Sequence, residues 1–145
     1  MQQVYYSPVF FDRVGLRYIN AIQREKLGLS HDVPWKRLIG PLALGFLSDD
    51  TMLSKISGFS SVTEVKEKNG AVTRIVTALG QVKNNGQTTQ HKEEISFIID
   101  TDSFFGKTNI NDAIMNLDKL HQVASEVFQS MITEELQATM EPMMT

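Results

Sequence analysis

Two arginines and two aspartates are the residues whose types and spacing most directly suggest chemistry in this chain. Arg13 and Arg17 lie in a stretch with strand character, and Asp100 and Asp102 lie at the end of another such stretch, IIDTD. Because side chains alternate across a strand, each pair occupies one face of its strand. Guanidinium groups form strong bidentate pairs with carboxylates and phosphates. The arginines are therefore either a floor for an anionic ligand or, if the two strands are neighbours, partners of the aspartates; we favour the ion pairs.

Gly15 separates the two arginines on their strand face. A glycine within a strand permits the close approach of a ligand or of another backbone. It also marks β-bulges, so both interpretations stay open.

The three histidines do not form an evident metal site or catalytic site. His31, His91 and His121 include no pair at the i, i+4 spacing typical of metal ligands on a helix. For His121, beside the apolar stripe of a predicted helix, we favour a half-buried position at the helix–sheet boundary. The enzymatic alternative is a hydrolase or nucleotide-processing enzyme that uses Asp100, Asp102 and His121. No nucleophile elbow, P-loop or G-x-G-x-x-G motif supports it, so we expect no catalytic residues, cofactor or metal.

The composition is typical of one globular domain and narrows the range of partners. Of the 145 residues, 41% are hydrophobic and 21% charged, which suffices for a single core. A net charge of −3 argues against a nucleic-acid binder, which normally carries an excess of Lys and Arg. No apolar run approaches the ~20 residues of a membrane span, and the first ten residues lack the features of a signal peptide. The absence of cysteine fits a cytoplasmic location.

The N-terminal third is predicted to contain one strand and several short helical segments. The strand covers residues 9–20. A short helix follows and ends near Gly28, and Pro34 occupies an early position of the next helical segment. Three large apolar residues of this segment are expected to face the core: Trp35, Leu38 and Ile39.

The middle of the chain is predicted to form a three-stranded antiparallel meander. Its strands cover residues 54–66, 71–83 and 89–101. Asn69-Gly70 predicts a type I′ hairpin turn between the first two strands, because both residues tolerate a positive φ. The sequence NNGQ at 84–87 predicts a second hairpin turn.

The C-terminal third is predicted to be a long helix. Asn109 is placed to cap it, with Asp112 as the reciprocal partner. Beyond this cap the helix either runs without a break or restarts at Thr133, and Pro142 is predicted to stop it. Apolar residues recur every three or four positions and form one stripe: Ile110, Ala113, Leu117, Leu120, Ala124, Val127 and Met131.

These elements predict an α+β fold, in which an antiparallel sheet of four or more strands carries the long C-terminal helix across one face. The apolar face of the sheet is the only large surface on which the helix stripe can be buried. We expect a single domain over residues 1–145, with residues 1–8 and 141–145 frayed.

Several motifs resemble those of a sporadically distributed prokaryotic family of uncharacterised proteins. They are RVGLRYIN, W..LI.PL, IIDTD, and LDKLH with a later Phe and IT, and they span residues 10 to about 142. Members of the family are usually longer, and this chain resembles their C-terminal half. The resemblance implies no activity, but it points to a set of positions: Arg13, Gly15, Arg17, Tyr18, Asn20, Trp35, Asp100, Asp102, Leu117, His121 and Phe128.

A sheet covered by one helix leaves one face and at least one edge without a partner, and such surfaces usually find one. We therefore expect a non-catalytic binding or assembly module that acts as a homodimer or with another protein. The alternative is a helix-grip-like binder of a small anionic or apolar ligand, by analogy at the level of the fold. In that alternative four residues line the site: Arg13, Arg17, Tyr18 and Trp35.

Overall fold

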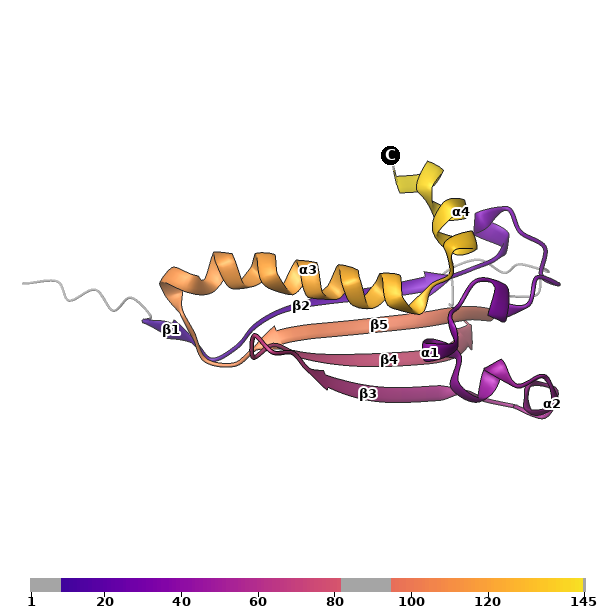
Figure 1. Cartoon of the computed structure of the whole chain (residues 1–145), viewed down its shortest axis with the longest axis horizontal. Helices are drawn as coiled ribbons and strands as arrows, with labels where there is room; N and C mark the ends of the chain where they lie inside the picture. Colours follow the sequence, from indigo (N-terminus) through magenta and orange to yellow (C-terminus); the bar gives the residue numbers. More distant parts are fainter. Residues whose placement is uncertain (1–8, 82–94, 145) are drawn as a thin grey trace, which may run out of the picture.

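The centre of the fold is a four-stranded antiparallel sheet. The computed structural model describes residues 9–81 and 95–144. Every pair of neighbouring strands in the sheet is antiparallel, and the arginine strand lies beside the aspartate strand. The predicted α+β architecture is therefore confirmed. In spatial order (Figure 1), the strands are β2 (Val14–Ile22), β5 (Ile95–Phe105), β4 (Val72–Gln81) and β3 (Ser60–Lys66).

Three of the predicted strands have different boundaries in the structure. The strand predicted to end at residue 101 continues to Phe105 as β5. A separate short ribbon pairs β1 (Phe10–Phe11) with β6 (Thr108–Asn109), so the strand predicted over residues 9–20 is divided, and its second part, β2, runs on to Ile22. The strand predicted over residues 54–66 begins only at Ser60, because α2 (Asp50–Leu53) and a loop precede it.

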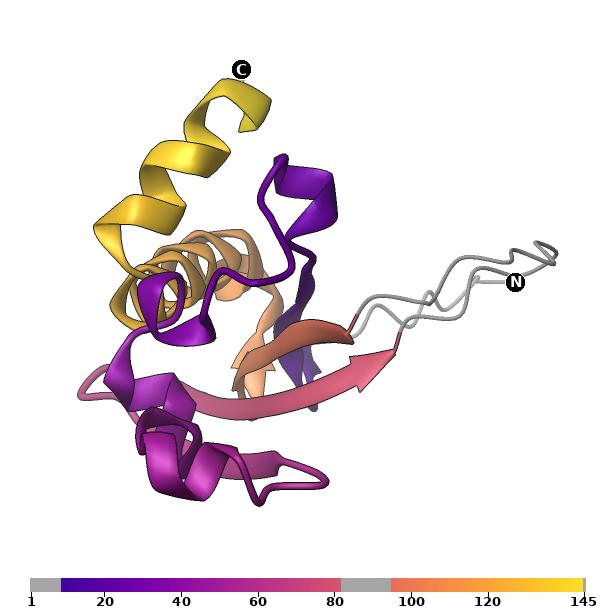
Figure 2. The same cartoon turned by 90° about the vertical axis from the view of Figure 1, so that its right-hand side faces the viewer.

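The long helix α3 (Ala113–Met131) packs across β2 and β5 on one face of the sheet (Figures 1 and 2). Leu120 and Ala124 of the predicted stripe are buried, as is Met131 at its end. Ile110 is exposed, because it lies in a 3₁₀ turn, η4 (Ile110–Asp112), that precedes the helix. The apolar stripe is therefore confirmed along α3, but Ile110, the first residue predicted for it, lies outside the helix and is exposed.

Asn109 caps the turn before α3 rather than α3 itself. Its side chain accepts a hydrogen bond from the backbone N–H of Asn111 at 2.9 Å. Asp112 gives no side-chain capping bond at the start of α3. The predicted cap residue is correct, but the reciprocal bond is not formed.

Short helical turns join β2 to β3. The first of them ends at Gly28, as predicted. Gly28 has the left-handed conformation, with a φ of 73°. Trp35, Leu38 and Ile39 are buried and pack in one core with residues of β5, so their predicted position is confirmed. The turns are η1 (Glu25–Leu27), η2 (Trp35–Arg37), α1 (Pro41–Leu44) and η3 (Gly45–Ser48).

The turn between β3 and β4 is not the predicted type I′ turn. Among the described residues only glycines have a positive φ, so Asn69 lacks the conformation that a type I′ turn requires. The Gly70 N–H donates to the Glu67 carbonyl at 3.0 Å, and Gly70 has a φ of 92°. This is a type I turn followed by a left-handed glycine. The Asn69 side chain instead accepts a bond from the Ala71 N–H at 2.9 Å. The second predicted turn, at 84–87, lies outside the described residues.

A second helix, α4 (Glu134–Met144), follows α3 after a break. The predicted restart at Thr133 is confirmed, because its hydroxyl accepts a bond from the Leu136 N–H at 3.2 Å and donates to the Arg37 carbonyl at 2.6 Å. The prediction that Pro142 stops the helix is wrong. A proline this near the end removes a single backbone hydrogen bond, and α4 continues to Met144.

Candidate functional site

Arg13 and Arg17 bind the two aspartates of β5. The Nε and Nη2 atoms of Arg17 donate to Oδ1 and Oδ2 of Asp100 at 3.0 and 2.7 Å. The Nη2 atom of Arg13 donates to Oδ2 of Asp102 at 2.9 Å. The predicted ion pairs are confirmed, and both guanidinium groups are engaged by acids of the chain's own sheet rather than left as a floor for an anion.

The bidentate pair fixes the charge of Asp100. The hydrogen bonds from Arg17 hold the pKa of Asp100 below its ordinary value, against the opposing effect of partial burial, and the positive charges of Arg17 and Arg74 act in the same direction as the bonds. Asp100 likewise raises the pKa of Arg17. Asp100 is therefore an ionised partner of Arg17 and not a proton-exchanging group at neutral pH.

Gly15 is the residue that lets Arg13 reach its partner. It pairs regularly with Phe104, so it marks no bulge. The Arg13 guanidinium lies 4.3 Å from the centre of the Phe104 ring. A Cβ at position 15 would lie 3.2 Å from the Cβ of Phe104 and 3.3 Å from Nη1 of Arg13. The absence of a side chain thus opens the space through which Arg13 crosses to Asp102.

A row of alternating charges crosses the whole sheet. Cross-strand neighbours of opposite charge attract one another. Four residues, which we call the charged row, lie opposite one another in the register, in the order Arg17 (β2), Asp102 (β5), Arg74 (β4) and Glu64 (β3). Within residues 9–81 and 95–144, neither Arg74 nor Glu64 forms an ion pair, so two of the four keep their charge available.

The charged row lies on the face of the sheet opposite α3, because Arg17 alternates along β2 with Tyr18, whose hydroxyl contacts His121 of α3. No described element covers that face (Figure 2). We call it the uncovered face. Ile19 and Val62, each two residues from the charged row on the two edge strands, are 61% and 59% exposed. The pocket beside the row measures only about 100 Å³, below the roughly 300 Å³ at which ligand sites begin. The face is therefore partly apolar, and the pocket beside its charged row is too small for a typical ligand.

Tyr18 and His121 form a separate pair on the other side of the sheet. The Tyr18 hydroxyl lies 2.9 Å from Nδ1 of His121, and the two rings meet edge to face. Tyr18 precedes Ile19 in β2 and points to α3, whereas Asp100, which is opposite Ile19, points to the uncovered face. The sheet separates His121 from Asp100 and Asp102, so these three residues do not come together as the enzymatic alternative would require.

Trp35 belongs to the core and not to a ligand site. Its ring centre lies 5.8 Å from that of Phe97, and the Arg24 guanidinium lies 4.3 Å from the centre of the Trp35 ring. Trp35 and Tyr18 lie on the helix side of the sheet and the two strand arginines on the other. The four residues predicted to line a helix-grip-like site therefore do not line one site.

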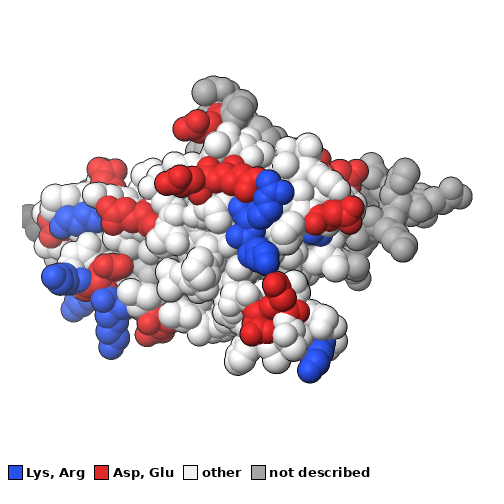
Figure 3. All heavy atoms as spheres, turned by 45° about the vertical axis from the view of Figure 1, so that its right-hand side comes forward, with Lys and Arg blue, Asp and Glu red and all other residues white. Residues whose placement is uncertain are grey.

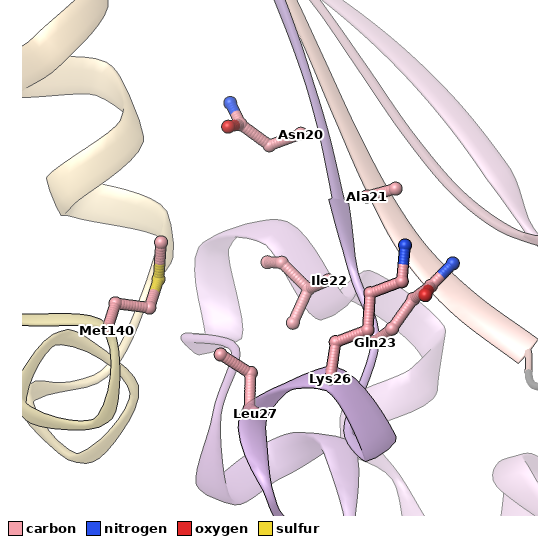
Figure 4. A pocket seen from close by; sticks show the side chains of 7 residues that line it. All are labelled: Asn20, Ala21, Ile22, Gln23, Lys26, Leu27 and Met140. Atoms are coloured by element: carbon pink, nitrogen blue, oxygen red, sulfur yellow. The ribbon is translucent and has the colours of Figure 1, made fainter. Parts of the chain in front are cut away.

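Two adjoining pockets of about 300 and 320 Å³ flank Met140 of α4. We call them the Met140 pockets. In the first, between α4, β2 and η1, Asn20, Ile22 and Leu27 point towards Met140 (Figure 4). The second lies between α3 and α4 and includes Phe128. Of the predicted site residues, Asn20 lines the first of the Met140 pockets, whereas Arg17, Asp100 and Asp102 line the small pocket beside the charged row. Met140 was not predicted; the late cluster of methionines, a residue type suited to adaptable contact surfaces, is the sequence feature that indicates it.

The charges on the surface are mixed. On the side of the molecule shown in Figure 3, acidic and basic side chains lie in adjacent groups with uncharged areas between them. Examples of surface ion pairs are Lys36–Asp50 and Arg37–Glu135. The described residues contain no cluster of three acids or histidines that could hold a metal ion. None of the described helices is long and apolar enough to cross a membrane.

Comparison with known proteins gives no guide to the function. No family model matches the chain, and neither a curated protein nor a solved structure matches it significantly. The geometry of the uncovered face and of the Met140 pockets is therefore the basis for assigning a function.

Proposed function

We propose that this protein is a non-catalytic binding or assembly module that uses the uncovered face to contact another protein chain. The observation that carries the proposal is the exposure of Ile19 and Val62 on a sheet face that no described element covers. Burying apolar surface is favourable by about 25 cal/mol per Å², so an apolar face of this kind is stabilised by a partner. We also propose a cytoplasmic location and membership of the family that the motifs resemble.

The charges of the uncovered face favour a protein partner over a small anion. A balanced set of charges does not attract an anionic ligand from solution. Protein interfaces, in contrast, combine apolar residues with complementary charged pairs. The ion pairs and the charged row together contain three arginines, Arg13, Arg17 and Arg74, and three acids, Asp100, Asp102 and Glu64.

Site-specific labelling tests the proposed contact surface, because the chain contains no cysteine. A Val62→Cys variant carries one thiol on the uncovered face. An Ile114→Cys variant carries a control thiol on α3, where Ile114 is 77% exposed. In dilute solution both thiols should react with a maleimide at similar rates.

The two thiols should differ once a partner is available. At high protein concentration, or in an extract of the cells that naturally produce the protein, the thiol at position 62 should react several-fold more slowly while the control rate does not change. Unchanged rates at both positions under all these conditions would refute the proposal.

A second candidate function, the binding of a small apolar molecule, is favoured by the Met140 pockets. Their volumes of about 300 and 320 Å³ lie at the lower end of the range for ligand sites. Their lining combines apolar side chains such as Ile22 and Leu27 with few polar groups such as Asn20, which is the composition typical of such sites.

Filling the pocket tests this second function. A Met140→Trp variant should bind the apolar fluorophore 1-aminoanthracene several-fold more weakly than the wild type, because the larger ring occupies the space beside Asn20. An Ile114→Trp variant, altered at an exposed position on α3, should bind it as the wild type does. A wild-type protein that does not bind the fluorophore saturably would exclude this function.

A further inference from the structure

We infer that the partner of the uncovered face is a second copy of this chain, packed face to face about a twofold axis that runs parallel to the strands between β5 and β4. This inference rests on the proposed function and names its partner. It follows from the order of charges in the charged row, because that order is complementary to itself about one axis only.

The strand order determines which residues meet in such a dimer. Rotation about an axis parallel to the strands, midway between β5 and β4, brings the order β2-β5-β4-β3 opposite β3-β4-β5-β2 of the second copy. Arg17 then faces Glu64 of the other copy, and Asp102 faces Arg74 of the other copy. All four contacts in the row join opposite charges.

The other way of stacking the two faces is unfavourable. A twofold axis perpendicular to the strands would place each member of the charged row opposite itself, so that Arg17 would meet Arg17 and Asp102 would meet Asp102. Like charges in direct opposition destabilise an interface. Packed sheets lie about 10 Å apart, with their strands within about 30° of alignment, a separation that arginine and glutamate side chains span from both sides.

The neighbouring rows of the uncovered face are compatible with the same axis. On one side of the charged row, Ile19 faces Val62 of the second copy, which covers the two exposed apolar residues with each other. Asp100 faces Val76 and keeps its partner within its own chain, because Arg17 binds it through Nε and Nη2 and presents Nη1 to Glu64 of the second copy. On the other side, Phe104 faces Val72, and Lys66 faces Gly15, beside which Arg13 is already paired with Asp102 of its own chain.

The size of the face sets the strength of the dimer. Four strands about 4.8 Å apart, with about eight residues each at about 3.3 Å, give roughly 500 Å² per copy. The total of roughly 1,000 Å² is at the lower limit for specific protein interfaces. We therefore expect a dimer in exchange with the monomer, with a dissociation constant in the micromolar range.

Charge exchange between two variants tests the inference by sedimentation velocity. In Arg17→Glu homodimers the introduced glutamate would face Glu64 twice, and in Glu64→Arg homodimers the introduced arginine would face Arg17 twice. Each variant alone should show a dissociation constant raised on the order of tenfold or more. In an equimolar mixture both outer contacts join opposite charges again, so a heterodimer should form with an affinity close to that of the wild type.

Folding controls keep the result interpretable. Circular dichroism and a thermal melt must show that both variants are folded, because Arg17→Glu also loses the pair with Asp100. An Ile19→Lys variant, whose charge would lie opposite Asp100 of the same sheet, should abolish the dimer without lowering the stability of the monomer. A mixture that associates no more tightly than its components overturns the inference.

The labelling experiment separates this inference from the function on which it rests. A wild-type protein that stays monomeric at millimolar concentration, while the thiol at position 62 is protected only in the cell extract, overturns the second-copy inference and leaves the proposed function standing. Protection that rises with the concentration of the purified protein, together with recovery in the mixture of variants, supports both.

Discussion

The pair of Arg17 and Asp100 should make the stability of the protein depend on pH in a defined direction. Arg17 holds the pKa of Asp100 below its ordinary value, mainly by hydrogen bonding. The unfolded chain, in which this pKa is about 3.9, therefore binds the proton more readily than the folded chain does. The Arg17–Asp100 pair contributes fully to the free energy of unfolding at pH values above the Asp100 pKa of the unfolded chain. This contribution is lost as the pH falls through the lowered Asp100 pKa of the folded chain.

An Arg17→Met variant tests this dependence. Its Asp100 pKa should move up towards the ordinary value, as followed by a titration of the carboxyl carbon by NMR. Urea unfolding should show the variant to be less stable than the wild type at neutral pH, and the difference should shrink in acid, below the folded pKa. Arg13→Met is the matched control, because it removes the contact to Asp102 and should leave the pKa of Asp100 unchanged. An Asp100 pKa that is identical with and without Arg17 would disprove the assignment.

At the level of elements, Thr133 holds the junction between α3 and α4 in place. Its hydroxyl donates to the Arg37 carbonyl and accepts from the Leu136 N–H, and its own N–H donates to the Leu38 carbonyl at 2.9 Å. We expect Thr133→Ala to lower the free energy of unfolding by about 1 kcal/mol, because the cap of α4 is lost. Thr133→Ser keeps the hydroxyl and should retain most of that stability in urea unfolding. Equal losses in the two variants would show that the hydroxyl is not the cause.

The elements that periodicity predicts well are those with two unlike faces. β5 alternates buried residues such as Phe97 and Ile99 with less buried ones, and α3 carries its apolar stripe at helical spacing. The predictions were wrong where the conformation of a turn or the end of a helix depends on contacts with neighbouring residues. Asn69 was expected to adopt a positive φ, but its side chain bonds the Ala71 N–H instead, and Pro142 lies close enough to the end of α4 to be tolerated.

The candidate site was predictable only as far as one strand pair. The bond of Arg17 to Asp100 follows from strand alternation once β2 and β5 are neighbours, whereas Arg13 lies just before β2 and reaches Asp102 from outside the strand. The participation of Arg74 and Glu64 depends on the register of two further strand pairs, which no local pattern in the sequence determines. The Met140 pockets depend on the direction in which α4 leaves α3, and this direction is set by contacts with residues far away in the chain.

Dimerisation through the uncovered face would make the thermal stability of the whole molecule depend on protein concentration. For a dimer that dissociates on unfolding, mass action raises the free energy of unfolding per dimer by about 1.4 kcal/mol for each tenfold rise in protein concentration. Two chains of 145 residues unfold with a combined entropy of about 0.6 kcal/mol per K. The unfolding midpoint should therefore rise by about 2 °C per tenfold increase, above the concentration at which the dimer forms.

Scanning calorimetry over two decades of concentration measures this slope. The wild type should follow it, whereas Ile19→Lys, which places a charge where the two sheets meet, should give a midpoint that does not change with concentration. The Glu64→Arg and Arg17→Glu variants should each show the slope only above a concentration at least about tenfold higher than the wild type, and an equimolar mixture should show it at the concentration of the wild type. A wild-type midpoint that stays constant where sedimentation detects a dimer would mean that the association does not stabilise the native fold, and the uncovered face would then not be its interface.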